Sequence, residues 1–206
     1  MTTAAGNRLV KVWAADARFA AAQVGKLNQT GRFADRVDTE RTAYIGHSFG
    51  GASALEACRT DPHCTGAVDL DGGQFGPVVQ NGLHAPLLIL GSENSCITGS
   101  CTVHNKTDRH DRAIANSLLA ASTGSAWCYG IRGTKHFNFS DYGTYYLAKP
   151  LRSFLALGKI DGRLGLKVQN AYLGAFLDQS VKGHPQQLLA RHSNRFPQVQ
   201  VLRAPG

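Results

Sequence analysis

Apolar positions along the 206 residues follow two patterns, one typical of helices and the other of short buried strands. Residues 7–28 place Leu9, Val12, Phe19, Val24 and Leu27 at near-helical spacing, and a glycine lies shortly beyond, which predicts a long first helix. Helices are also expected over four later segments: 50–58, 109–121, 143–157 and 168–180.

Four short segments are expected to be strands: 42–46, 66–71, 86–91 and 126–131. The third, Pro86-Leu-Leu-Ile-Leu-Gly91, has no polar side chain, as expected of a parallel strand buried on both faces. Because the strands alternate with helices along the chain, the pattern predicts an α/β fold with a mostly parallel sheet and flanking helices.

Length and composition agree with one domain of this class. The chain is 43% hydrophobic and long enough to bury a substantial core. It contains no apolar run near 18 residues and no basic-then-apolar start typical of a secretory signal. We therefore expect a soluble protein, with an extracytoplasmic location open if the true N-terminus is missing.

The net charge of +8 is concentrated toward the C-terminus. Residues 159–206 hold seven of the 22 basic residues and two of the 14 acidic ones, a net +5 for this segment. We expect a basic tail of helices and loops, either simply solvated or in weak contact with an anionic membrane surface. A dense Lys/Arg cluster and a nucleic-acid motif are both missing, so no nucleic-acid partner is expected. The oligomeric state is left open.

Five cysteines occur as two close pairs and a single residue: Cys58 and Cys64, Cys96 and Cys101, and Cys128. Disulfides and free thiols are equally compatible with each pair. A zinc site at the second pair with His104 and His110 is disfavoured, because the gap before His104 is far shorter than a zinc finger requires. We expect no metal and no other cofactor.

The chemistry-bearing motif is Gly46-His47-Ser48-Phe49-Gly50, a G-x-S-x-G sequence. The pentapeptide alone is weak evidence, but a predicted strand ends at Gly46 and a predicted helix begins at Gly50, as at a nucleophile elbow. The flanking glycines let the backbone pass close to a strained serine. This context predicts Ser48 as a nucleophile and the N–H of Phe49 as a donor to an oxyanion.

A serine nucleophile needs a base, and the base needs an orienting acid. His136 follows the fourth strand in a loop at the same sheet edge as the elbow, whereas His47 adjoins the serine and is expected to shape the pocket. Asp71 and Glu93 both end strands on this edge, so position alone does not decide which is the acid. Asp69 lies deeper and is interpreted as structural.

Three blocks of sequence resemble the platelet-activating-factor acetylhydrolase family: residues 46–51, 69–72 and 131–141. That family comprises α/β-hydrolase lipases and esterases that cleave short or oxidised acyl chains without a metal. The resemblance implies Ser48 as nucleophile, Asp71 as acid and His136 as base. Bacterial cutinase-like polyester hydrolases are similar at a greater distance, with the acid usually one strand later, where Glu93 lies.

The chain departs from this family before the elbow. Only 47 residues precede Ser48, mostly one helix, where the family carries further strands and a loop with a second oxyanion N–H. We therefore expect residues 1–206 to form a single, N-terminally incomplete α/β-hydrolase domain whose elbow strand is an exposed sheet edge. The predicted function is hydrolysis of short-chain or lipid carboxylic esters through an acyl-enzyme. The alternative is a non-catalytic or inactive hydrolase-fold protein.

Overall fold

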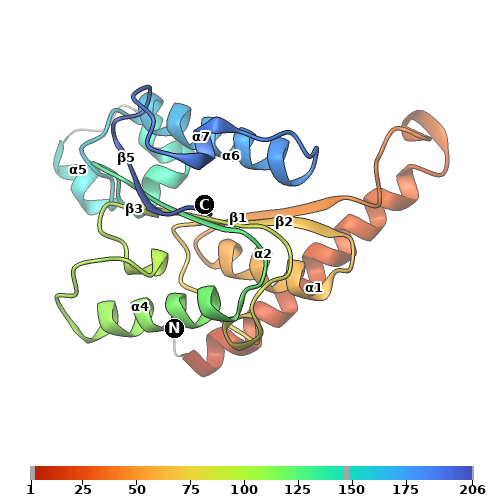
Figure 1. The fold of residues 1–206 in the computed structure, drawn as a ribbon, viewed down its shortest axis with the longest axis horizontal. Helices are drawn as coiled ribbons and strands as arrows, with labels where there is room; N and C mark the ends of the chain where they lie inside the picture. The colour runs from red at the N-terminus through yellow and green to blue at the C-terminus, as the bar shows by residue number, and fades with distance from the viewer. Residues whose placement is uncertain (1–2, 146–148, 206) are drawn as a thin grey trace.

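A five-stranded sheet in the order β1-β2-β3-β4-β5 forms the centre of the computed structural model, which describes residues 3–145 and 149–205 (Figure 1). The strands are β1 (Thr42–His47), β2 (Cys64–Leu70), β3 (Leu87–Ser92), β4 (Ala126–Ile131) and β5 (Val199–Arg203). The α-helices are α1 (Thr3–Leu27), α2 (Phe49–Thr60), α3 (Val78–Asn81), α4 (Lys106–Ala121), α5 (Lys149–Phe154), α6 (Gly162–Ser180) and α7 (Gln187–Ala190). Short 3-10 helices are η1 (Gly31–Phe33), η2 (Cys96–Thr98), η3 (His136–Phe139) and η4 (Asp141–Thr144).

The four predicted strands and their parallel pairing are confirmed, and β5 is added to them. Strands β1 to β4 pair in parallel, while β5 runs antiparallel to β4. The expectation of only helices and loops in residues 159–206 was therefore wrong for β5. This segment also contributes to the core, since Tyr172, Phe176, Phe196 and Val199 are almost completely buried. Its expected contact with an anionic membrane surface stays a prediction.

The predicted helices match the structure with one difference. Helices α1, α2, α4 and α6 cover the segments assigned to them within a few residues. The helix expected over 143–157 is replaced by the end of η4 and the short α5, and residues 146–148 lie outside the described part. Among the helices of the described residues, none is long and apolar enough to cross a membrane.

Alternate residues of the inner strands pack against helices on opposite faces of the sheet. Leu87 and Ile89 belong to the cluster that includes side chains of α1, α2 and α4. Leu88 and Leu90 belong to the cluster built with α6 and α7. Figure 1 shows these two sets of helices on opposite sides of the sheet. This two-sided burial explains why β3 has no polar residue before Ser92.

Helix α1 and strand β1 form the least covered side of the domain. The five apolar residues that indicated the first helix, from Leu9 to Leu27, are 40–66% exposed, and α1 instead turns Val10 and Ala14 toward the core. Among the described strands, β1 pairs only with β2. The predicted elbow strand is therefore at the sheet edge.

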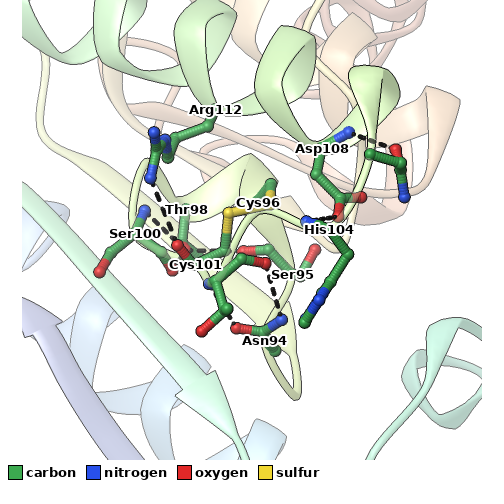
Figure 2. Close-up of a disulfide and its surroundings, with 11 residues drawn as sticks. Asn94, Ser95, Cys96, Thr98, Ser100, Cys101, His104, Asp108 and Arg112 are labelled. Atoms are coloured by element: carbon green, nitrogen blue, oxygen red, sulfur yellow. Dashed lines mark hydrogen bonds between the residues drawn. A yellow bond between two sulfur atoms is a disulfide. The ribbon is translucent and has the colours of Figure 1, made fainter.

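Both close cysteine pairs are disulfide-bonded. Cys58–Cys64 joins the end of α2 to the start of β2, and Cys96–Cys101 closes the loop after β3. Figure 2 shows the second bridge beside Arg112 of α4, whose guanidinium donates to the carbonyl oxygen of Cys101 at 3.4 Å. Since the bridge uses both thiols, they are not zinc ligands, and no cluster of three metal-ligating side chains occurs within 3–145 and 149–205.

Candidate active site

The turn between β1 and α2 holds Ser48 in a strained conformation. Ser48 has φ 59° and ψ −128°, a backbone geometry that L-residues rarely adopt. The turn is tight because a Cβ on Gly46 would lie 2.1 Å from the carbonyl carbon and oxygen of Gly50. The N–H of Ser48 donates to the carbonyl oxygen of Leu70 on β2 at 2.9 Å. The geometry is that of a nucleophile elbow.

Helix α2 begins immediately after the serine, at Phe49. The first N–H groups of a helix have no acceptor within the helix, and they carry the positive end of its dipole. The side chain of Ser48, the N-cap residue, makes no capping hydrogen bond to them. The N–H of Phe49 is therefore a donor suited to negative charge that develops beside the Ser48 hydroxyl.

The structure brings the three predicted site residues together at one edge of the sheet. Ser48 Oγ lies 3.0 Å from His136 Nε2, and His136 Nδ1 lies 2.9 Å from Asp71 Oδ2. An ionised carboxylate only accepts hydrogen bonds, so Nδ1–H donates to Asp71 and Nε2 is left to accept from the serine hydroxyl. This tautomer can take the serine proton.

Asp71 is held from both sides. It directly follows β2 with φ 51°, and its Oδ1 accepts a 2.7 Å hydrogen bond from the N–H of Ser92 at the end of β3. Its side chain is only 6% exposed. Burial alone raises the pKa of Asp71, but hydrogen bonds from His136 and Ser92 outweigh burial and keep the pKa below its usual value. The carboxylate is thus ionised at neutral pH.

Glu93, the other contender for the acid, has a different contact. Its side chain is exposed, and Oε2 accepts a hydrogen bond from the N–H of Gly133 at 3.1 Å. Gly133 belongs to the loop that leads from β4 to His136. Glu93 therefore braces the loop that carries the imidazole, and Asp71 contacts the imidazole itself.

Asp69 lies below the elbow, as its structural interpretation requires. It is fully buried and accepts hydrogen bonds from Gly72 N at 2.9 Å and Gln74 Nε2 at 3.0 Å. Burial raises the pKa of Asp69 well above its usual value. Gln74 also donates to the carbonyl oxygen of Ile97 at 3.0 Å, which connects this network to the disulfide-closed loop. Sequence reasoning missed Gln74, because a single glutamine in a loop carries no recognisable pattern.

His47 supports the backbone of the predicted base. Its Nε2–H donates to the carbonyl oxygen of His136 at 3.0 Å, and the two rings lie 4.6 Å apart. The ring of Phe139 is nearly parallel to that of His47, with an interplanar angle of 15° and a centroid distance of 6.3 Å. Burial and the nearby His136 lower the pKa of His47. The expectation that His47 shapes the pocket missed this bond, which depends on a contact 89 residues away.

Three known proteins that are similar to this chain in sequence or fold are named as esterases or an acetylhydrolase. A protein from Arthroderma benhamiae named "Probable 1-alkyl-2-acetylglycerophosphocholine esterase" is 27% identical over 79% of this chain and 43% of its own length. The Bos taurus platelet-activating factor acetylhydrolase is 28% identical over 70% of this chain and 30% of its own. The solved structure of a ferulic acid esterase from Streptomyces cinnamoneus, 26% identical, matches with a TM-score of 0.76 over 96% of this chain and 56% of that one.

These similarities confirm the predicted α/β-hydrolase fold. The chain spans less than half the length of the two curated relatives described above. The family described as platelet-activating factor acetylhydrolase, isoform II, matches residues 16–188, which include every candidate site residue. The resemblance predicted from three sequence blocks is thereby confirmed, and the chain belongs to the platelet-activating factor acetylhydrolase isoform II family.

Proposed function

We propose that this chain is a carboxylic ester hydrolase that acts through an acyl-enzyme on Ser48. The observation that carries the proposal is the unbroken hydrogen-bonded series from Ser48 Oγ through the imidazole of His136 to the buried carboxylate of Asp71. A buried carboxylate, an imidazole in the matching tautomer and a serine at a strained turn together supply nucleophile, base and orienting acid.

Each residue has a defined role in the proposed reaction. Ser48 Oγ attacks the ester carbonyl while His136 Nε2 takes its proton, and the N–H of Phe49 donates to the oxyanion that forms. The imidazolium then protonates the leaving alcohol, and the acyl group stays on Ser48. A water molecule that gives its proton to Nε2 next attacks the acyl group, which releases the acid and restores the serine. Asp71 stabilises the imidazolium both while the acyl-enzyme forms and while water hydrolyses it.

The relatives support two kinds of substrate, a lipid that carries a short acyl group and a small ester of an aromatic acid. The Arthroderma relative is named for the ester of an acetylated glycerophosphocholine, and the matching Streptomyces structure is named for an aromatic acid ester. The site is open to either kind of ester, since Ser48 and His136 are each partly exposed.

Covalent labelling by a fluorophosphonate tests the proposal. The intact chain should gain one phosphonyl group on Ser48, located by mass spectrometry of the peptides, and should hydrolyse p-nitrophenyl acetate. Ser48→Ala is the matched control and should lose both. A folded chain that takes no label and shows no turnover above Ser48→Ala would instead be a hydrolase-fold protein without catalytic function.

A further inference from the structure

The proposed reaction fixes where the alcohol portion of an ester must lie. His136 Nε2 donates the proton that the leaving oxygen accepts, so this oxygen has to come within hydrogen-bond distance of Nε2. The group attached to it therefore extends along the His136 side of the site. The side chains beside His136 therefore determine which alcohols the site accepts. This inference rests on the proposed function.

Three aromatic rings extend outward from the imidazole in an unbroken series. The ring of Phe137 lies 5.2 Å from that of His136, the ring of Tyr142 lies 5.8 Å from Phe137, and the ring of Tyr145 lies 6.2 Å from Tyr142. These centroid distances fall within the range of favourable aromatic contacts. We call Phe137, Tyr142 and Tyr145 the aromatic series.

The outer two rings are presented to solvent. Tyr142 is 49% exposed and Tyr145 is 56% exposed, although both side chains are large and mostly apolar. Neighbouring exposed aromatic rings beside a reactive group are typical of a ligand-binding surface, because a ligand covers area that water otherwise solvates. Successive rings are tilted by 65° and 53°, within the edge-to-face and tilted arrangements that aromatic pairs favour.

The segment that carries these rings is firmly anchored. Asn138 is buried, and its Oδ1 accepts from the N–H groups of Lys135 and Gly158 at 2.8 and 2.7 Å. The carbonyl oxygen of Asn138 accepts from Gln169 Nε2 of α6 at 2.7 Å. The next residue, Phe139, is buried, and its ring lies 6.3 Å from that of His47. The backbone beside Phe137, the innermost ring of the aromatic series, is therefore preorganised, which lowers the cost of ordering the protein when a ligand binds there.

We propose that the aromatic series binds the alcohol portion of the substrate and that the preferred substrates are esters of arylalkyl alcohols. In the proposed complex, an aromatic ring one or two bonds from the ester oxygen packs against Phe137 and Tyr142 while the oxygen accepts the proton from His136 Nε2. The contact persists in the transition state, so it raises kcat/KM for these esters relative to esters of small aliphatic alcohols.

Three acetates test the inference on the intact chain: benzyl acetate, cyclohexylmethyl acetate and ethyl acetate. They share the acyl group, and the acetate released is the common readout. We expect kcat/KM to decrease in the order benzyl, cyclohexylmethyl, ethyl. The benzyl ester should exceed the cyclohexylmethyl ester by about threefold or more, since an aromatic pair contributes about 0.5–1.5 kcal/mol beyond area burial. Equal or better hydrolysis of the cyclohexylmethyl ester overturns the aromatic assignment.

Variants of Tyr142 identify the surface responsible. Tyr142→Ala should lower the benzyl-to-ethyl ratio of kcat/KM about fivefold or more, whereas Tyr142→Phe, which keeps the ring, should retain it. The matched control is Phe33→Ala, because Phe33 is also 49% exposed and lies in η1, between α1 and β1. Figure 1 shows the segment between α1 and β1 on the right, far from α5 on the left. This control should leave the ratio at its original value.

Failure of this inference is distinguishable from failure of the proposed function. If Ser48 takes the fluorophosphonate label and the acetates are hydrolysed, but Tyr142→Ala keeps the original benzyl-to-ethyl ratio, the aromatic series is not the alcohol site and the esterase proposal stands. If Ser48 takes no label and none of the acetates is hydrolysed, both proposals are refuted.

Discussion

Replacing Asp71 by asparagine tests the proposed site most directly, because the structure specifies how the substitute amide must sit. Asp71 Oδ1 accepts from the N–H of Ser92 at 2.7 Å, and only an oxygen can keep that bond. The new NH₂ group then takes the place of Oδ2, 2.9 Å from His136 Nδ1. It donates to Nδ1, which moves the imidazole proton to Nε2 and leaves no acceptor for the proton of Ser48.

The expected loss is large. The same substitution in another Ser-His-Asp triad lowers kcat about 10⁴-fold through the wrong tautomer. With the amide fixed by Ser92, we expect kcat for p-nitrophenyl acetate to fall about 10³–10⁴-fold, equivalent to about 4–5.5 kcal/mol of transition-state stabilisation. Labelling of Ser48 by a fluorophosphonate should slow in parallel. Near-UV circular dichroism should verify that the fold is retained.

Glu93→Gln is the matched comparison for Asp71→Asn. Glu93 is exposed and holds only the N–H of Gly133, a bond that a glutamine oxygen can also accept. Surface substitutions of this kind change free energies by about 0.5 kcal/mol or less, so kcat should stay within about twofold. If Glu93→Gln costs more rate than Asp71→Asn, or if Asp71→Asn stays within tenfold of the unchanged chain, the assignment of the acid is refuted.

Three further changes have defined outcomes. Gly46→Ala should lower the free energy of unfolding in urea by more than about 2 kcal/mol and abolish fluorophosphonate labelling of Ser48, because the added Cβ would lie 2.1 Å from the Gly50 carbonyl. A variant that is stable and takes the label contradicts the tight turn. Because the pKa of His47 is lowered in the folded chain, the unfolded chain, with the usual pKa of 6.5, binds the proton more readily, and stability should fall as pH drops below about 6.5. His47→Gln should reduce this fall in urea titrations from pH 5 to 8, and equal slopes in the two proteins contradict it. Replacing Cys96 and Cys101 together by serine should lower kcat, because it loosens the loop whose Ile97 carbonyl oxygen accepts from Gln74, the side chain that also donates to Asp69 below the elbow. The same change at the other disulfide should affect mainly stability, and equal effects on kcat contradict the link.

Sequence patterns predicted the inner strands and the elbow because both depend on local signals. An apolar run such as that of β3 and a serine between a strand end and a helix start are recognisable without tertiary contacts. The choice between Asp71 and Glu93 is not local, since both end parallel strands at one edge. It depends on the turn at Asp71, with φ 51°, which directs the carboxylate toward Ser92 N and the imidazole.

Strand β5 and the exposed face of α1 show why the remaining features could not be read from the sequence. Val199-Gln-Val-Leu-Arg203 is short and follows a basic, polar stretch, so its alternation did not stand out; only pairing with β4 makes it a strand. In α1, helical spacing of apolar residues indicated a helix but not its orientation. The small side of α1, at Val10 and Ala14, faces the core because it can approach α2 closely, and the larger side chains remain outside.

The position of the nucleophile at an edge strand does not weaken its support, because that support comes from β2 and the turn after it. Leu70 accepts the Ser48 N–H, a Cβ on Gly72 would lie 2.2 Å from the Ser48 carbonyl oxygen, and a Cβ on Gly51 would lie 2.0 Å from Oδ1 of the buried Asp69. The same turn carries the triad acid, so elbow and acid are fixed to one another through β2. Ester turnover depends in addition on oxyanion stabilisation, where one donor is worth about 10²–10³ in rate. The serine should therefore react with a fluorophosphonate even where ester turnover is slow, and labelling is the more sensitive measure of the site.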